Sequence, residues 1–287
     1  MIVVKSKDEL KELINQRIRE QGPKCDLNDI DVSKIDDMSF LFHDSPFNGD
    51  ISGWDTSNVE DMSFMFDSSK FNSDLSRWDV SKVKDMSWIF RGSSFNRDIS
   101  GWSVSNVENM RGMFTGSKFK GDISAWDVSN VRNMESMFLN SIFNGDISNW
   151  DVSNVRNMSG MFCNSHFKGD ISRWDTSKVE DMADMFWNSK FNNDISQWDV
   201  SRVKSMSHMF TNSKFNKDIS KWDVSSVEDM NCMFAWSVFN KDISSWDVSN
   251  VRNMNYMFSK SKFKGDLSKW NTSKVEQSLH IFNPDLH

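Results

Sequence analysis

The sequence predicts an α/β repeat solenoid in which each 24-residue coil contains one short parallel strand and one short helix. A tryptophan recurs every 24 residues from Trp54 to Trp270, without insertion or deletion. Around each of these ten tryptophans runs the motif F-N-x-D-I-S-x-W-D-V-S-x-V-x-x-M-x-x-M-F-x-x-S-x. Hydrophobic residues make up only 38% of the 287, yet 13 are Trp, 23 Phe and 19 Met. A unit too small to bury its apolar side alone must stack on its neighbours, so these observations indicate an elongated array.

The first expected element is an amphipathic helix over residues 7–21. Ser6 and Glu9 form a capping-box pattern, and Gly22 with Pro23 ends the helix. One face carries Leu10, Leu13, Ile14 and Ile18. We expect residues 1–25 to form an N-terminal capping helix that covers the end of the array. A membrane-surface helix is the weaker alternative, because the polar face is not rich in lysine and large interfacial aromatics are missing.

Each coil is then expected to contain a short helix. In the unit after Trp54, apolar residues and a serine follow helical spacing at Val59, Met62, Met65, Phe66 and Ser69. Ser57 is a natural N-cap residue, and Glu60 completes a capping box. The same pair recurs as Ser105/Glu108, Ser177/Glu180, Ser225/Glu228 and Ser273/Glu276.

The rest of each coil, such as residues 74–78, is too short for a helix and predicts a brief strand. Stacked coils give each strand a parallel neighbour at about 4.8 Å, so ten to eleven coils make a rod about 50 Å long. A strand and a helix per 24 residues lie in the leucine-rich-repeat range. We expect this array to occupy residues 26–287 as one continuous domain. Its last unit ends at Phe282, and residues 283–287 either blunt the terminal strand edge or leave it to pair with another copy.

In a stack, each repeat position becomes a column of residues. The Asp column from Asp50 to Asp266 is interpreted as accepting hydrogen bonds from turn N–H groups, with a row of bound calcium ions as the alternative. The Trp column is interpreted as core, with carbohydrate stacking as the alternative. A third column alternates in charge and predicts a ladder of ion pairs between coils. It reads Asp36, Glu60, Lys84, Glu108, Arg132, Arg156, Glu180, Lys204, Glu228, Arg252, Glu276.

Departures from the repeat predict two apolar patches that would bind a protein partner. The candidate residues are Phe64, Trp88, Leu139, Ile142, Cys163, His166, Trp187 and Trp236. In the alternative, Phe40 and Phe64 pack under the N-terminal helix and the core absorbs Trp187. The variable residue before each tryptophan, such as Gln197 or Lys221, is a further candidate, but this set lacks apolar anchors.

Several functional classes are disfavoured. A net charge of −7 argues against a broad nucleic-acid or anionic-membrane surface, and no apolar run approaches bilayer length, which predicts a soluble chain. Three cysteines form neither a disulfide framework nor a metal motif. Cys163 and His166 have the spacing of a nucleophile pair or two metal ligands, but we interpret the pair as chance. We therefore expect no catalysis, no cofactor and no metal.

The repeated motif, over residues 26–282, resembles that of the BspA-like bacterial leucine-rich-repeat surface proteins. This resemblance implies a curved or rod-like solenoid at the cell surface or secreted, which binds a protein on a host or neighbouring cell as an adhesion module. It implies no catalytic residue. The sequence shows no signal peptide, so the export route stays open and a cytoplasmic location is the alternative. A rod that self-associates end to end or laterally is the alternative function.

Overall fold

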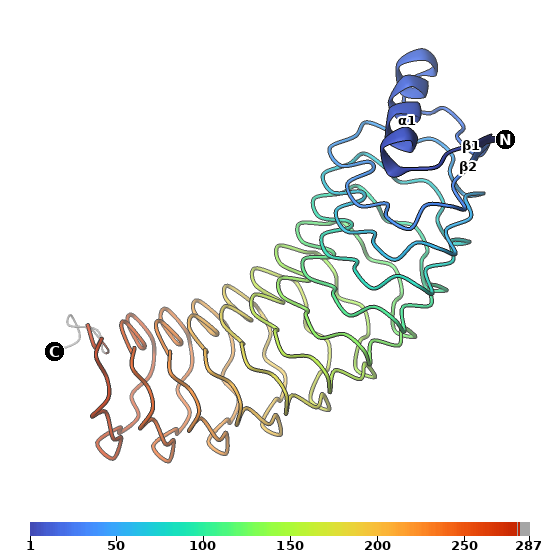
Figure 1. The fold of residues 1–287 in the computed structure, drawn as a ribbon. Helices are drawn as coiled ribbons and strands as arrows, with labels where there is room; N and C mark the ends of the chain where they lie inside the picture. The colour runs from blue at the N-terminus through green and yellow to red at the C-terminus, as the bar shows by residue number, and fades with distance from the viewer. Residues whose placement is uncertain (280, 282–287) are drawn as a thin grey trace.

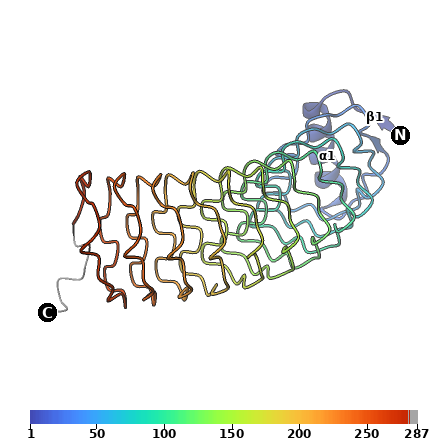
Figure 2. The same cartoon turned by 90° about the horizontal axis from the view of Figure 1, so that it is seen from below.

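The computed structural model describes residues 1–279 and 281, which form a curved rod of stacked coils (Figure 1). In both views the coils follow one another along a bent axis (Figures 1 and 2). The helix and strands of the described residues lie at the N-terminal end: β1 (Ile2–Val3), α1 (Lys7–Gln21) and β2 (Ile30–Asp31). β1 and β2 pair in parallel, with Ile2 opposite Ile30. The protein is therefore a repeat protein whose coils are built almost entirely from turns.

The predicted N-terminal helix is present as α1 and packs on the first coil. The hydroxyl of its N-cap residue, Ser6, accepts a hydrogen bond from the N–H of Glu9 at 3.2 Å. The Glu9 carboxylate accepts from the N–H of Lys5 rather than of Ser6, so the capping box is formed one residue out of register. Leu10 and Ile14 are fully buried against the core of the array, which attaches the helix to it.

The prediction of a helix in every coil is wrong. Residues 62–69 form consecutive turns, in which the N–H groups of Met65, Asp67 and Ser69 each donate to the carbonyl three residues earlier. The alternate N–H groups, from Met62 to Ser68, donate instead to carbonyls of the next coil. Two residues of this segment, Phe64 and Ser68, have φ near +56°, which an α-helix does not accommodate. The segment therefore directs half of its N–H groups out to the next coil.

The prediction of a strand over residues 74–78 and its equivalents is also wrong. The N–H of Trp78 donates to the carbonyl of Leu75 at 3.1 Å, and the N–H of Ser76 donates to the Asp74 carboxylate at 2.9 Å. These bonds close a turn, so the segment does not pair as a strand. Parallel bridges occur elsewhere, as isolated pairs such as Asp61 with Asp85. The α/β assignment and its helix-plus-strand coil are thus replaced by coils of turns joined by single bridges.

The core is a set of residue columns that run the length of the rod. Phe66 stacks on Phe90 at 5.7 Å between ring centroids, and Phe71 stacks on Phe95 at 6.3 Å. The tryptophans from Trp54 to Trp246 are only 3–4% exposed. Every indole N–H from Trp54 to Trp270 donates to the carbonyl 27 residues earlier, at 3.0–3.2 Å. This burial confirms the Trp column as core and rules it out as a carbohydrate-stacking row.

Candidate binding surfaces

Two columns per coil have a left-handed backbone, and most of the unusual surface residues stand in them. The first column contains residue 64 and its equivalents, and the second contains residue 68 and its equivalents; φ lies between 51° and 62° throughout. Glycine, Asn and Asp adopt this conformation readily, whereas it is an outlier for a bulky side chain. The first column contains Phe40, Phe64, Trp88 and Tyr256, and the second contains Trp236. These aromatic residues are held in a backbone that favours small or amide side chains.

Phe40, Phe64 and Trp88 form an aromatic staircase on three successive coils. Phe40 stacks on Phe64 at 4.5 Å, and Phe64 stacks on Trp88 at 6.2 Å. Phe40 is 41% exposed, so it is not buried under α1 as the alternative interpretation required. Phe64 and Trp88 are half-buried. The staircase is therefore a stack of rings that is partly exposed to solvent at the N-terminal end of the rod.

Two guanidinium groups lie over the aromatic staircase. Cζ of Arg91 lies 5.5 Å from the Phe64 ring centroid and 5.2 Å from that of Trp88, and Cζ of Arg111 lies 5.4 Å from the Trp88 ring. Arg91 is fixed by two hydrogen bonds to the fully buried carboxylate of Asp67, which also contacts Nδ1 of His43 at 3.0 Å. The pKa of Arg91 is raised, first by its hydrogen bond to Asp67. Arg111 donates a hydrogen bond to the Glu135 carboxylate at 2.8 Å, so both cations that border the staircase are held in place.

The staircase ends because Trp88 occupies the space of the next side chain. A Cβ built at Gly112, the next residue of the column, would lie 2.0 Å from Cε3 of Trp88. Glycine is therefore required at this position, and a glycine inside the expected helix is a sign of this requirement that can be read from the sequence.

The second predicted patch is a groove lined by amides. Leu139, Cys163 and Trp187 line it on three successive coils, and Trp187 is 45% exposed. Beside them runs a ladder of four asparagines in the second left-handed column: Asn140, Asn164, Asn188 and Asn212. We call these seven residues the amide groove; its volume is about 360 Å³. The sequence predicts the apolar side of this groove. The Asn ladder was not predicted, although its asparagines recur at the 24-residue spacing.

Other candidates of this patch lie apart from the groove lining. His166 is exposed and Ile142 is half-buried, whereas Cys163 is only 6% exposed. Burial raises the pKa of the Cys163 thiol to about 12, and the nearby Asp184 adds to the effect. A thiol with this pKa is protonated at neutral pH and is a poor nucleophile or metal ligand. This environment favours the interpretation of Cys163 and His166 as a chance pair.

Trp236 follows Asn212 on the next coil of the second left-handed column, just beyond the amide groove, and is 52% exposed. Nζ of Lys260 lies 5.9 Å from its ring centroid, on the adjacent coil of the same column.

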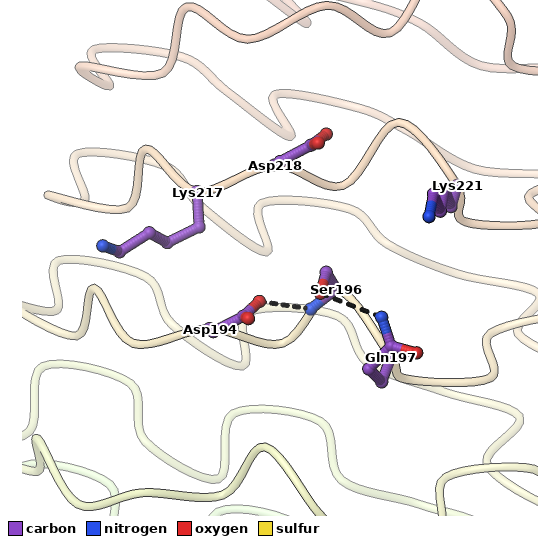
Figure 3. Close-up of a pocket in the computed structure, with 6 residues that line it drawn as sticks. All are labelled: Asp194, Ser196, Gln197, Lys217, Asp218 and Lys221. Atoms are coloured by element: carbon purple, nitrogen blue, oxygen red, sulfur yellow. Dashed lines mark hydrogen bonds between the residues drawn. The ribbon is translucent and has the colours of Figure 1, made fainter.

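The Asp column lines shallow polar hollows on another face. In Figure 3, Asp194 and Gln197 lie on one coil, and Lys217, Asp218 and Lys221 on the next. Each carboxylate accepts from the N–H two residues later, as Asp194 does from Ser196 at 2.9 Å. This bond, joined by one from the serine hydroxyl, lowers the pKa of column members such as Asp218. The turn interpretation is confirmed, and the calcium alternative gains nothing from it.

The predicted charge ladder is present. Six of its opposite-charge neighbours contact within 4.0 Å: Glu60–Lys84, Glu108–Arg132, Arg156–Glu180, Lys204–Glu228, Glu228–Arg252 and Arg252–Glu276. These side chains are about half exposed or more, so each ion pair adds little to stability. The pairs instead favour one alignment of neighbouring coils, because a slip by one coil would oppose like charges.

The predicted end of the last unit at Phe282 and the tail at residues 283–287 lie outside the described residues. No helix in the described part of the chain has the length and hydrophobicity needed to cross a membrane.

Comparison with known proteins gives one family. A family described as a Mycoplasma protein of unknown function, DUF285, matches residues 10–118, 93–193, 115–214 and 187–285. No curated protein and no solved structure matches the chain. The four overlapping matches follow the repeat through almost its whole length, from α1 to the last described coil. The chain therefore belongs to the DUF285 family of repeat proteins.

Proposed function

We propose that this chain is a non-catalytic adhesion module that binds a protein on a host or neighbouring cell through the aromatic staircase. The observation that carries the proposal is the presence of Phe40, Phe64 and Trp88 in left-handed backbone. Such strain costs about 1–2 kcal/mol per residue and is retained where surrounding structure enforces it, commonly at functional sites. Glycine fills the same column at Gly112 and Gly160, so folding does not require an aromatic there.

The composition of the surface supports a protein partner. Aromatic residues and arginine dominate the binding energy of protein interfaces, where the aromatic ring fills a pocket of the partner. Here the rings of Phe64 and Trp88 are flanked by Arg91 and Arg111, which are ordered before binding. Pre-ordered side chains lose less conformational entropy when a partner binds.

Location at the bacterial surface belongs to the same proposal. It rests on the similarity of the repeat motif to BspA-like leucine-rich-repeat surface proteins, together with the extended shape of the rod (Figure 1). A long rod presents many coils to one partner, which suits display on a cell.

The experiment compares two variants that each remove one aromatic from the same column. Phe40→Asn and Tyr256→Asn both place an amide, which tolerates left-handed backbone, at sites with exposures of 41% and 39%. Labelled host-cell surface proteins are captured on the immobilised chain. Phe40→Asn should lose the capture that wild type and Tyr256→Asn retain, with an unchanged melting midpoint. Equal capture by both variants contradicts the staircase as the site.

Self-association is the other candidate, and the same surface predicts how it would be detected. If the partner is a second copy, light scattering will show a mass that rises with concentration and returns to that of the monomer in Phe40→Asn. A persistent monomer at all concentrations removes this candidate.

A further inference from the structure

We infer that the amide groove binds a neutral oligosaccharide in extended, β-linked form. This site lies on different coils from the aromatic staircase, and the inference stands independently of the proposed protein partner.

The Asn ladder has unused hydrogen-bonding capacity in a regular row. Nδ2 of Asn164 donates to Oδ1 of Asn140 at 2.5 Å, Nδ2 of Asn188 to Asn164 at 2.6 Å, and Nδ2 of Asn212 to Asn188 at 2.7 Å. A carboxamide has two N–H donors and two acceptor lone pairs. An inner amide of the ladder uses one donor and one lone pair on its neighbours. Because all four side chains are exposed, the remaining donor and lone pair are available to a ligand.

This row of paired donors and acceptors suits sugar hydroxyls. A hydroxyl both donates and accepts, so one hydroxyl satisfies the free N–H and the free lone pair of an amide. The ladder repeats once per coil, at about the strand spacing of 4.8 Å. A pyranose advances by a similar length along an extended β-linked chain, so successive sugars can meet successive amides.

Trp187 provides the apolar part of the site. Its exposed ring stands beside the ladder, 6.0 Å from the ring of His208, and an indole face can pack on the C–H face of a pyranose. Leu139 and Cys163 continue the apolar edge. A groove of about 360 Å³ with an apolar wall and a few convergent polar groups has the character of a small-ligand site.

The described lining of the groove favours a neutral ligand over a charged one. None of the described residues that line the groove is ionised at neutral pH, since the Cys163 thiol has a pKa of about 12. Phosphates and acidic peptides are bound by arginine, lysine or helix N-termini, which this lining does not offer. A neutral polyol needs none of them.

The requirement for left-handed backbone does not by itself account for the ladder. The same column contains Gly92, Gly116 and Lys260 on other coils. Four amides in register therefore exceed what the backbone needs, and they coincide with the coils that carry Leu139, Cys163 and Trp187.

The test titrates the full chain with cellohexaose, chitohexaose and β-linked mannohexaose, and with hexamannuronate, which is also β-linked, as the acidic comparison. Binding is measured by calorimetry and by tryptophan fluorescence. We expect at least one neutral hexamer to bind, more tightly than its dimer because it spans more coils. Trp187→Ser should weaken that binding by roughly tenfold or more through loss of the stacked ring. Asn188→Gly, which keeps the left-handed backbone and removes one amide, should also weaken it.

Phe40→Asn is the matched control, since it removes an exposed aromatic ring on a coil far from the groove and should leave the sugar affinity unchanged. Melting midpoints close to that of wild type show that the variants are folded. The inference is overturned if no neutral hexamer binds, if the acidic hexamer binds better, or if Trp187→Ser and Phe40→Asn behave alike.

Discussion

Each coil has two residues with a left-handed backbone, and the energetic cost of this conformation depends on which side chain stands there. Where the column contains glycine or asparagine, the conformation costs little; where it contains Phe, Trp or Tyr, each coil gives up stability. The cost is small for one residue but recurs on adjacent coils at the aromatic staircase. Residue-scale substitutions in these columns therefore separate backbone strain from side-chain packing.

Gly112→Ala should destabilise the protein strongly. Alanine at φ of 60° costs about 1 kcal/mol, and a Cβ 2.0 Å from the Trp88 ring adds about 1–3 kcal/mol of overpacking. Gly116→Ala is the matched control, because its φ is 62° and the nearest heavy atom would lie at 4.0 Å. Urea unfolding should show a loss of about 1 kcal/mol for Gly116→Ala and clearly more for Gly112→Ala. Equal losses would mean that Trp88 moves aside without cost.

Trp236→Asn should leave the free energy of unfolding unchanged or raise it by up to about 1 kcal/mol. Asparagine tolerates the φ of 53°, and the lost contact with Lys260 is worth about 0.5–1 kcal/mol. Trp236→Ala removes the same ring without the tolerance of asparagine, so it should be less stable than Trp236→Asn in urea unfolding. A drop of several kcal/mol in both variants would show that Trp236 packs as core.

Within each coil, the repeated element is a turn closed by a carboxylate or amide. Asp50, Asp55 and Asp61 each accept from the N–H two residues later, at 2.7–3.1 Å. Asparagine replaces aspartate in some coils, as at Asn109 and Asn271, and accepts the same bond. Geometry rather than charge is thus the common requirement.

These turns predict that the protein loses stability in acid. The Ser148 backbone N–H, and then its hydroxyl, hydrogen-bond to the Asp146 carboxylate and lower its pKa, and the equivalent serines lower the pKa of Asp122, Asp170 and Asp218 in the same way. A carboxyl whose pKa is lower in the fold contributes stability that is complete above its unfolded pKa, about 4. That stability is lost as the pH falls through the lower folded value. Melting midpoints should therefore be level from about pH 7 to 5 and fall below about pH 4.

The variants at Asp146 test the cause. Asp146→Asn keeps an acceptor and should melt near wild type at pH 7, with a slightly shallower fall in acid. Asp146→Ala loses the acceptor and should melt lower at every pH. If the two variants melt alike at pH 7, the hydrogen bond from Ser148 does not stabilise the turn.

The sequence predicted the repeat, the buried Trp column and the helix at residues 7–21, because each depends on spacing and on which residues are apolar. The sequence-based prediction was wrong about the structure within each coil, where turns replace the expected helix. The spacing of Val59, Met62 and Phe66 fits a helix, but the same residues also point inward from consecutive turns. Glycine and asparagine at Gly112 and Asn140 contradict a helix, and this signal was in the sequence. The Asn ladder was missed because the segment was expected to be helical, and a helix gives no reason to follow the 24-residue recurrence of asparagine from Asn140 to Asn212 as a column.

At the scale of the whole molecule, each coil contacts its neighbours, so stability is a sum over coils and interfaces. The inter-coil backbone hydrogen bonds join residues 23 to 25 apart, as from Met62 to Asp85 and from Glu60 to Asp36. Because the period is constant, removing 24 residues joins equivalent positions. The charge ladder then determines which deletion is favourable.

Deleting residues 127–150 should leave a folded rod with a melting midpoint near that of the full chain. The deletion removes Arg132, whose neighbour in the charge ladder is the like-charged Arg156, and places Glu108 beside Arg156. Deleting residues 199–222 removes Lys204 and places Glu180 beside Glu228, two like charges. Both deletions remove one coil of core, so the difference between them reports the ladder. The second deletion should melt lower in dilute buffer, and salt should narrow the gap because exposed charges are screened. A gap that persists in high salt, or a first deletion that fails to fold, would show that the coils are not interchangeable units.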